Sequence, residues 1–334
     1  MDWSTGYTAS YYIKTVDAST WRDLDTYQIT GGSVSRSTGN LRESATVDMP
    51  NIPEGTEAWV RIYLDARQGG DGVREPLFTG LMSAPANEWN GTRNKHSCEC
   101  YSVLKPASDV LLKRGWYAPA GANGAQLAAD LLAVGAAPVE YAEAAPALAS
   151  SIIAEKSESN LTMAQKIIDA IGWRIRISGD GTIYIEPKDY SERAAFDTLT
   201  NDIVEFSVTD TRDLFSCPNV FRATANDLTA VARDDDPESP LSTVGRGREV
   251  WMDESSCKLN ANESIAQYAQ RRLREEQAPA REVSYTRRYW PDVTVGDAVR
   301  LNLPGQGITG LFRITSQKIE LGYSAKTSEE AIEI

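Results

Sequence analysis

The chain has 334 residues, which is enough for about two domains of ordinary size. Its 47 acidic and 34 basic residues leave a net charge of −13, which opposes binding to the phosphate backbone of nucleic acids, so we expect no sequence-specific nucleic-acid partner. No apolar run approaches the ~20 residues that span a bilayer, and residues 1–6 do not resemble a secretory leader. We therefore expect a protein that is cytoplasmic when made and has no membrane partner.

The first hundred residues carry the alternation that is typical of antiparallel strands. Residues 58–65 have one apolar face and one face of polar and aromatic side chains. The apolar face consists of Ala58, Val60, Ile62 and Leu64. Three glycines at residues 69–72 favour a chain reversal before a return strand at residues 76–82.

The period becomes helical between about residues 107 and 190. The first predicted helix has an apolar face made of Leu127, Leu131, Leu132 and Val134. A second helix is predicted to begin at Thr162, which has the spacing of a capping box with Gln165, and to end at Gly172. Its apolar stripe consists of Met163, Ile167, Ile168 and Ile171. A hairpin with strands at 173–177 and 182–186 completes a small α+β insert.

Strands predominate again in the last third of the chain. They are expected at residues 203–208, 219–224, 282–289, 298–303 and 309–321. Asn260 with Glu263 predicts the start of a third helix, which ends before Pro279.

Metal-ligand residue types gather only at residues 96–100, where His96, Cys98 and Cys100 alternate along a predicted strand. Zinc sites usually draw on two separated ligand pairs, and the sequence has no second pair of this kind. The acidic run Asp234–Glu238 lacks the ligand spacing of an EF-hand and is typical of a solvated loop. Four sparse cysteines, which also include Cys217 and Cys257, predict reduced thiols. We predict no metal site and no cofactor.

The sequence contains no recognisable set of catalytic residues. It has one histidine and no nucleophile elbow, and residues 245–248 lack the third glycine of a dinucleotide site. Carboxylates such as Asp65, Glu75 and Asp292 are too numerous to indicate a glycoside hydrolase pair. We therefore predict a protein that is not an enzyme and has no catalytic or cofactor-binding residues. The eight tryptophans are spread along the chain, which favours core or interface positions over a sugar-stacking platform.

The order of these elements resembles the tail hub proteins of bacteriophages, the group that shares the fold of the baseplate hub of contractile-tailed phages, and most closely the hubs of defective prophages of the PBSX type. The stretches that carry the resemblance are Pro76–Leu81, Thr162–Pro187, Pro218–Ala223, Val293–Leu301 and Leu311–Ile314. Their order and spacing extend over nearly the whole chain.

The resemblance implies a homotrimer with two β-barrel domains per chain, so that six similar barrels match a hexameric tail tube or distal tail protein. A spike or tail-tip protein would dock on the other side. In this interpretation the protein has a structural role, is made in the bacterial cytoplasm and ends up in the tail of a virion or phage-like particle. The family core has no catalytic residues, and a chain that ends at Ile334 is not expected to carry an added lysin domain.

The expected fold class is mainly β with an α+β insertion. A first, discontinuous barrel is expected at residues 1–106 with 188–226, the inserted helix-helix-hairpin domain at 107–187, and a second barrel at 227–334 with a helical excursion at 260–277. Two other functions fit a β-rich chain with many tryptophans. A carbohydrate-binding host-recognition module would present a groove of exposed aromatic rings, and a cell-wall hydrolase would place two carboxylates across a cleft.

Overall fold

The computed structural model describes the chain from residue 1 to 334, apart from residues 4, 40, 53–56, 84–85, 91–92, 198–202, 213, 226–227, 256, 258–263, 278–280 and 324–325, and apart from the side chains of 86–90, 93–95, 203–206 and 225. The fold is mainly β. The chain forms two compact units. The first contains Met1–Val208 and Ser284–Ala331, and the second contains Thr209–Val283 and Ile332–Ile334.

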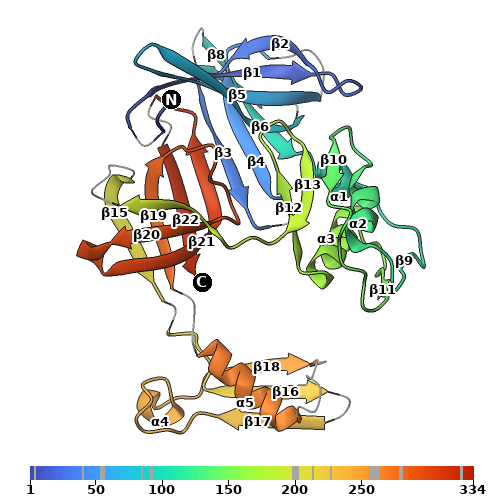
Figure 1. Cartoon of the computed structure of the whole chain (residues 1–334), viewed down its shortest axis with the longest axis vertical. Helices are drawn as coiled ribbons and strands as arrows, with labels where there is room; N and C mark the ends of the chain where they lie inside the picture. The colour runs from blue at the N-terminus through green and yellow to red at the C-terminus, as the bar shows by residue number, and fades with distance from the viewer. Residues whose placement is uncertain are drawn as a thin grey trace. The chain divides into compact units, whose positions relative to one another are not determined.

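The N-terminal strands form one half of the large sheet in the first unit (Figure 1). They are β1 (Thr8–Val16), β2 (Asp23–Gln28), β3 (Gly31–Ser37), β4 (Glu43–Met49), β5 (Ala58–Gln68), β6 (Asp71–Met82), β7 (Ala86–Asn90) and β8 (Arg93–Ser102). The sheet order from β3 is β3-β4-β8-β6-β5-β1-β2, with β7 paired to β8. The described strand pairs in this half are antiparallel, as predicted.

The C-terminal strands continue the same sheet, because β21 pairs with β3. This half contains β14 (Glu192–Asp197), β15 (Ile203–Thr211), β19 (Glu282–Arg288), β20 (Ala298–Leu303), β21 (Ile308–Glu320) and β22 (Lys326–Glu333). A short 3₁₀ turn, η1 (Pro304–Gln306), joins β20 to β21. The order continues from β3 as β21-β22-β19-β15, and β20 pairs with both β14 and β21. The described strands therefore form no closed barrel.

The predicted period-2 pattern of β5 is confirmed. Val60, Ile62 and Leu64 have no exposed surface and pack in one core with residues from β1, β3, β4, β6 and β8. The reversal into β6 is also confirmed, because Gly69 and Gly70 have φ angles of 57° and 100°. These angles lie in the region that side chains other than that of glycine rarely adopt.

The residues between β8 and β14 form both helices and short strands, and we call this segment the insert (Figure 1). Its elements are α1 (Lys105–Asp109), β9 (Tyr117–Ala118), α2 (Gly124–Leu132), β10 (Val139–Tyr141), β11 (Ile152–Ile153), α3 (Asn160–Ala170), β12 (Trp173–Ile177) and β13 (Ile183–Pro187). The helices pack on the β10-β13-β12 sheet around their own core, which is separate from the core of the N-terminal strands.

Two details of the helix predictions are wrong. The N-cap of α3 is Ser159 and not Thr162, because the Ser159 side chain accepts a hydrogen bond from the backbone N–H of Thr162. Val134 lies beyond the end of α2 and is exposed. The C-terminal signal of α3 is confirmed, since Gly172 has a φ of 70° immediately after the cap residue Ile171.

The second unit contains a three-stranded sheet with one helix across it (Figure 1). Its elements are β16 (Val220–Ala225), β17 (Leu228–Arg233), α4 (Thr243–Arg246), β18 (Trp251–Ser255) and α5 (Ile265–Glu276). The predicted helix is present as α5, and its capping box is made by Ser264 and Gln267. The predicted start at Asn260 and Glu263 lies outside the described residues.

The strand pairing differs from the expected first barrel at residues 188–226. In the structure β14 pairs with β20, β15 pairs with β19, and β16 belongs to the sheet of the second unit. The physical reason is that an alternating sequence specifies which face of a strand is buried but not which strand edge it joins.

Candidate interaction sites

The turn between β12 and β13 is held tightly against the N-terminal strands. The carbonyl oxygen of Asp180 accepts hydrogen bonds from Trp21 Nε1 at 3.0 Å and from Arg61 Nη2 at 2.9 Å. Thr79 Oγ1 donates to the carbonyl oxygen of Gly179 at 2.8 Å. These three contacts, from Trp21, β5 and β6, fix the hairpin turn of the insert on the N-terminal strands.

Gly179 is required here by close packing. A Cβ atom at this position would lie 1.8 Å from the carbonyl oxygen of Pro76, so no other residue fits without movement of the backbone. Arg61 is itself buried and pairs with Asp23 at 2.7 Å between Nη1 and Oδ1. The contact between the insert and the sheet therefore includes specific polar interactions beside the apolar packing of Trp21 and Trp59.

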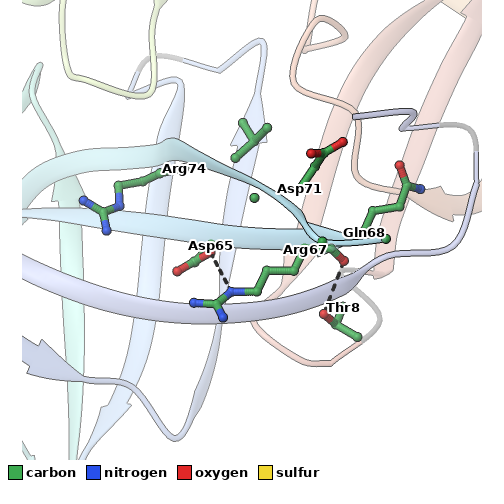
Figure 2. Close-up of a pocket in the computed structure, with 10 residues that line it drawn as sticks. Thr8, Asp65, Arg67, Gln68, Asp71 and Arg74 are labelled. Carbon is green, nitrogen blue, oxygen red and sulfur yellow. Dashed lines mark hydrogen bonds and ion pairs between the residues drawn. The ribbon is translucent and has the colours of Figure 1, made fainter.

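An open cavity of about 620 Å³ lies at the tip of the β5–β6 hairpin (Figure 2). Its lining is polar and rich in glycine: Thr8, Asp65, Arg67, Gln68, Gly69, Gly70, Asp71, Gly72, Val73 and Arg74. Arg67 Nε lies 3.5 Å from Asp65 Oδ1, and Thr8 donates to the carbonyl oxygen of Arg67. Charges of both signs alternate along this edge, which suits polar contacts with another protein chain.

The same hairpin anchors the start of the chain. The Gln68 side chain accepts a hydrogen bond from the backbone N–H of Asp2 at 2.9 Å and donates to Thr5 Oγ1 at 2.6 Å. The hairpin tip and the first residues therefore form one surface.

A second cavity, of about 360 Å³, lies between the insert and the C-terminal strands. It is lined by Thr38, Arg42, Gln165, Asp169, Trp173, Arg174, Ile175, Lys188, Tyr190, Val295, Gly296 and Arg313. We call it the cationic pocket, because four of these residues are basic and one is acidic. No local sequence motif indicates this site, since its residues come from segments up to 275 positions apart (313 minus 38).

Residues 96–100 have the predicted strand geometry. Cys98 and Cys100 are buried on the same face of β8, opposite Val47 and Ala45 of β4. Burial raises the pKa of both thiols. Among the described residues no group of three or more histidine, cysteine, aspartate or glutamate side chains is arranged to hold a metal ion.

The acidic run Asp234–Glu238 lies in the loop between β17 and α4. Its carboxylates bind neighbouring groups of the same unit. Asp234 Oδ2 accepts from Ser239 and from Gln277, and Asp235 pairs with Arg233 at 3.5 Å. This arrangement is that of a hydrogen-bonded surface loop.

The three carboxylates named in the sequence analysis lie in different settings. Asp65 pairs with Arg67, on the opposite face of the hairpin from Glu75. Burial raises the pKa of Glu75, and the charge of Asp292 raises it further. Glu75 and Asp292 are thus electrostatically coupled, but both lie outside the two cavities described above.

Most of the described tryptophan rings are half-buried, and Trp173 is buried. Trp21 contacts Trp59 edge to face at 5.4 Å, and Trp3 contacts Tyr7 in the same way at 5.2 Å. Trp251 is the one largely exposed ring among the tryptophans whose side chains the structure describes. This distribution agrees with the predicted core and interface positions.

None of the described helices is long and apolar enough to span a membrane. No protein-family model matches the sequence, and no curated protein matches it.

The chain has the fold of phage tail proteins. It matches the tail protein of Neisseria meningitidis MC58 with a TM-score of 0.68 and 16% identity, over 98% of this chain and 97% of that one. It matches the 43 kDa tail protein of prophage MuSo2 from Shewanella oneidensis with a TM-score of 0.67 and 12% identity, over 97% and 98% of the two chains. A type VI secretion component of E. coli, c3393, matches with a TM-score of 0.51 and 9% identity, over 96% of this chain and 76% of that one. That protein is described as structurally similar to the T4 tail proteins gp27 and gp5.

Proposed function

We propose that the protein is the tail hub of a phage or phage-like particle, a structural adapter between a hexameric tail tube and a trimeric spike or tip. The observation that carries the proposal is the fold match with two tail proteins over nearly the full length of both chains. The short stretches that resemble phage hubs support the same proposal, because that resemblance rests on the sequence alone.

The two halves of the large sheet suggest how one chain meets a sixfold tube. In our proposal the group β1–β8 and the group β14, β15 and β19–β22 each take the place of one barrel of the tube. Three chains then supply six such groups and match the tube's symmetry. The insert, near residues 107–187, remains a separate domain in this plan. In this plan β19–β22 belong to the expected second barrel at 227–334, and α5 falls within its expected helical excursion at 260–277.

The proposed partners are two further copies of this chain, a tail tube or distal tail protein, and a spike or tail-tip protein. The proposed location is the bacterial cytoplasm during assembly and the tail of the particle afterwards. The protein has no catalytic role in this proposal.

Light-scattering mass after size-exclusion chromatography tests the proposal. Three chains of 36.6 kDa give a trimer of about 110 kDa (3 × 36.6). We expect three copies of the chain, either at this mass in isolation or within the larger complex that forms with its tube and spike proteins, because assembly partners can supply surface that the isolated chain lacks. A chain that stays monomeric with both partners present contradicts the proposal.

The alternative functions are tested by binding and turnover. Retention on peptidoglycan or capsular polysaccharide, lost in Trp251→Ala, would favour a host-recognition module. Release of muropeptides from cell walls, lost in Glu75→Gln or Asp292→Asn, would favour a hydrolase. We expect neither result.

A further inference from the structure

The cationic pocket has more positive charge than its own carboxylates neutralise. Arg174 is compensated, because it pairs with Glu186 at 2.8 Å and with Asp297 at 3.3 Å. Arg42, Lys188 and Arg313 have no ion-pair partner among the residues that the structure describes, and Asp169 is the only acidic residue in the lining. The pocket is therefore positive in a chain whose net charge is −13.

Arg42 enters the pocket from the segment before β4. Its Nη2 donates to Gln165 Oε1 at 2.5 Å, and its Nε is buried without a hydrogen-bond partner. Burial lowers the pKa of Arg42, Asp169 offsets part of this effect, and the positive charge of Arg174 adds to it. A guanidinium group stays protonated in proteins, so this site holds a charge that lacks a complete set of acceptors.

Arg313 on β21 also lacks a complete set of hydrogen-bond acceptors. Its Nη1 donates to the Tyr190 hydroxyl at 3.3 Å, its guanidinium lies 5.7 Å from the Tyr190 ring centre, and its Nε is also buried without a partner. A buried donor without an acceptor costs about 1–3 kcal/mol, and more when it is charged. Two arginines that line one cavity therefore lack a complete set of acceptors within the described residues, which favours an anion beside them.

The rest of the lining indicates what kind of anion fits. Val295, with the small exposed parts of the buried Trp173 and Ile175, borders the charged groups with apolar atoms. A glutamate side chain matches both parts, because its methylene groups are apolar and its two oxygens suit the fork of a guanidinium group. A phosphate group would leave the apolar part without a contact. Arginine and tyrosine, which are at least partly exposed in this lining, are also residue types that are enriched where proteins bind one another.

We propose that the cationic pocket binds a glutamate carboxylate on an acidic segment of a partner protein, with Arg42 and Arg313 as the residues that contact its oxygens. The inference deepens the proposed function, because it names a surface through which the hub would hold a neighbour. Its test uses the isolated chain, so the two proposals fail separately. A trimer without peptide binding would overturn only the pocket, and a chain that binds the peptide but stays monomeric with both assembly partners present would overturn only the trimer.

The experiment is calorimetric titration of the full chain with an acetylated and amidated tetraglutamate peptide at low salt. Inorganic phosphate and a single-stranded oligonucleotide are the competing probes. We expect peptide binding that Arg42→Gln and Arg313→Gln each weaken about tenfold, since a charge-assisted hydrogen bond is lost in each. Lys188→Gln should weaken it less, because Lys188 is solvent-exposed. Arg67→Gln, which removes a cation from the hairpin cavity, is the control and should leave binding unchanged.

Lys188→Gln keeps the test decisive if an arginine variant fails to fold, because the Lys188 side chain is exposed and its replacement should not unfold the chain. The inference is overturned if the peptide does not bind at millimolar concentration. It is also overturned if Lys188→Gln and the folded arginine variants bind the peptide as well as the parent chain does, or if these substitutions weaken only the binding of phosphate or of the oligonucleotide.

Discussion

Arg287 on β19 and Glu329 on β22 form a two-point ion pair that is closed off from solvent. Nη2 lies 2.5 Å from Oε1 and Nε lies 2.8 Å from Oε2, and the exposed fractions of the two side chains are 1% and 0%. Gln317 of β21 donates to Glu329 at 2.7 Å, and Arg36 of β3 donates to Gln317 at 2.8 Å. A continuous polar chain therefore crosses the β21–β3 junction, where the two halves of the large sheet meet.

Removal of one member of this pair should destabilise the first unit strongly. We expect Arg287→Met to lower the free energy of unfolding by about 3–5 kcal/mol, because Glu329 would remain buried without its counter-ion. Urea unfolding followed by circular dichroism measures the change. The matched control is Arg300→Met, which removes a half-exposed pair with Glu192 and should cost less than about 1 kcal/mol. Equal losses for the two variants would show that burial does not increase the contribution of the Arg287–Glu329 pair to stability.

Glu43 gives the first unit a defined pH dependence. Burial raises the pKa of Glu43 to about 8 from its usual 4.5, and the nearby Arg36 only partly opposes this shift. The folded state then holds the proton more tightly than the unfolded state. The resulting stability is fully present below pH 4.5 and is lost as the pH rises toward 8.

Glu43→Gln should remove this loss, since glutamine does not titrate. We expect the parent chain, compared with the variant, to lose on the order of a few kcal/mol between pH 4.5 and 8. Unfolding curves of both proteins at several pH values test this expectation. If the free energy of unfolding changes with pH in the same way for the parent chain and for Glu43→Gln, Glu43 is already ionised in the folded protein.

Gly179→Ala should weaken the attachment of the insert. The added methyl group would meet the Pro76 carbonyl oxygen, so we expect a loss of more than about 2 kcal/mol in unfolding free energy. Gly305→Ala is the control, because nothing lies within 4 Å of a Cβ atom at that position. That substitution should be neutral or slightly stabilising. A Gly179→Ala protein as stable as the control would contradict the close packing of the turn.

The thiols should differ in reactivity according to burial. Cys98, Cys100 and Cys217 are buried, whereas Cys257 is partly exposed. We expect a thiol reagent such as Ellman's reagent to modify Cys257 first in the native protein, and the other three only after unfolding. Rapid modification of Cys98 or Cys100 in the Cys257→Ser protein would show that the β8 core opens readily.

Cys98→Ala and Cys100→Ala should leave assembly intact, with packing losses of about 1 kcal/mol each. We also expect the unfolding temperature to be unchanged by EDTA, because these residues lie on a core strand face. A chelator-dependent loss of folding would contradict the strand interpretation.

Local patterns in the sequence determined the elements that depend on neighbouring residues. The alternation in β5, the glycines at its turn, the apolar stripe of α3 and the hairpin turn at Asp180 and Gly181 were all predictable, because side-chain periodicity and the φ preference of glycine act within a few residues. The α3 N-cap was not, since Ser159 and Thr162 are both good capping residues and only the backbone conformation selects one of them.

Tertiary structure alone decided which strands meet and which charges are buried. In the sequence Arg287 resembles a surface residue like Arg300, yet strand pairing buries the first against Glu329 and leaves the second half exposed. Arg42 and Arg313 belong to one pocket only because β21 pairs with β3. The physical reason is that burial and charge neutralisation depend on contacts between segments far apart in the chain, and a local pattern carries no information about them.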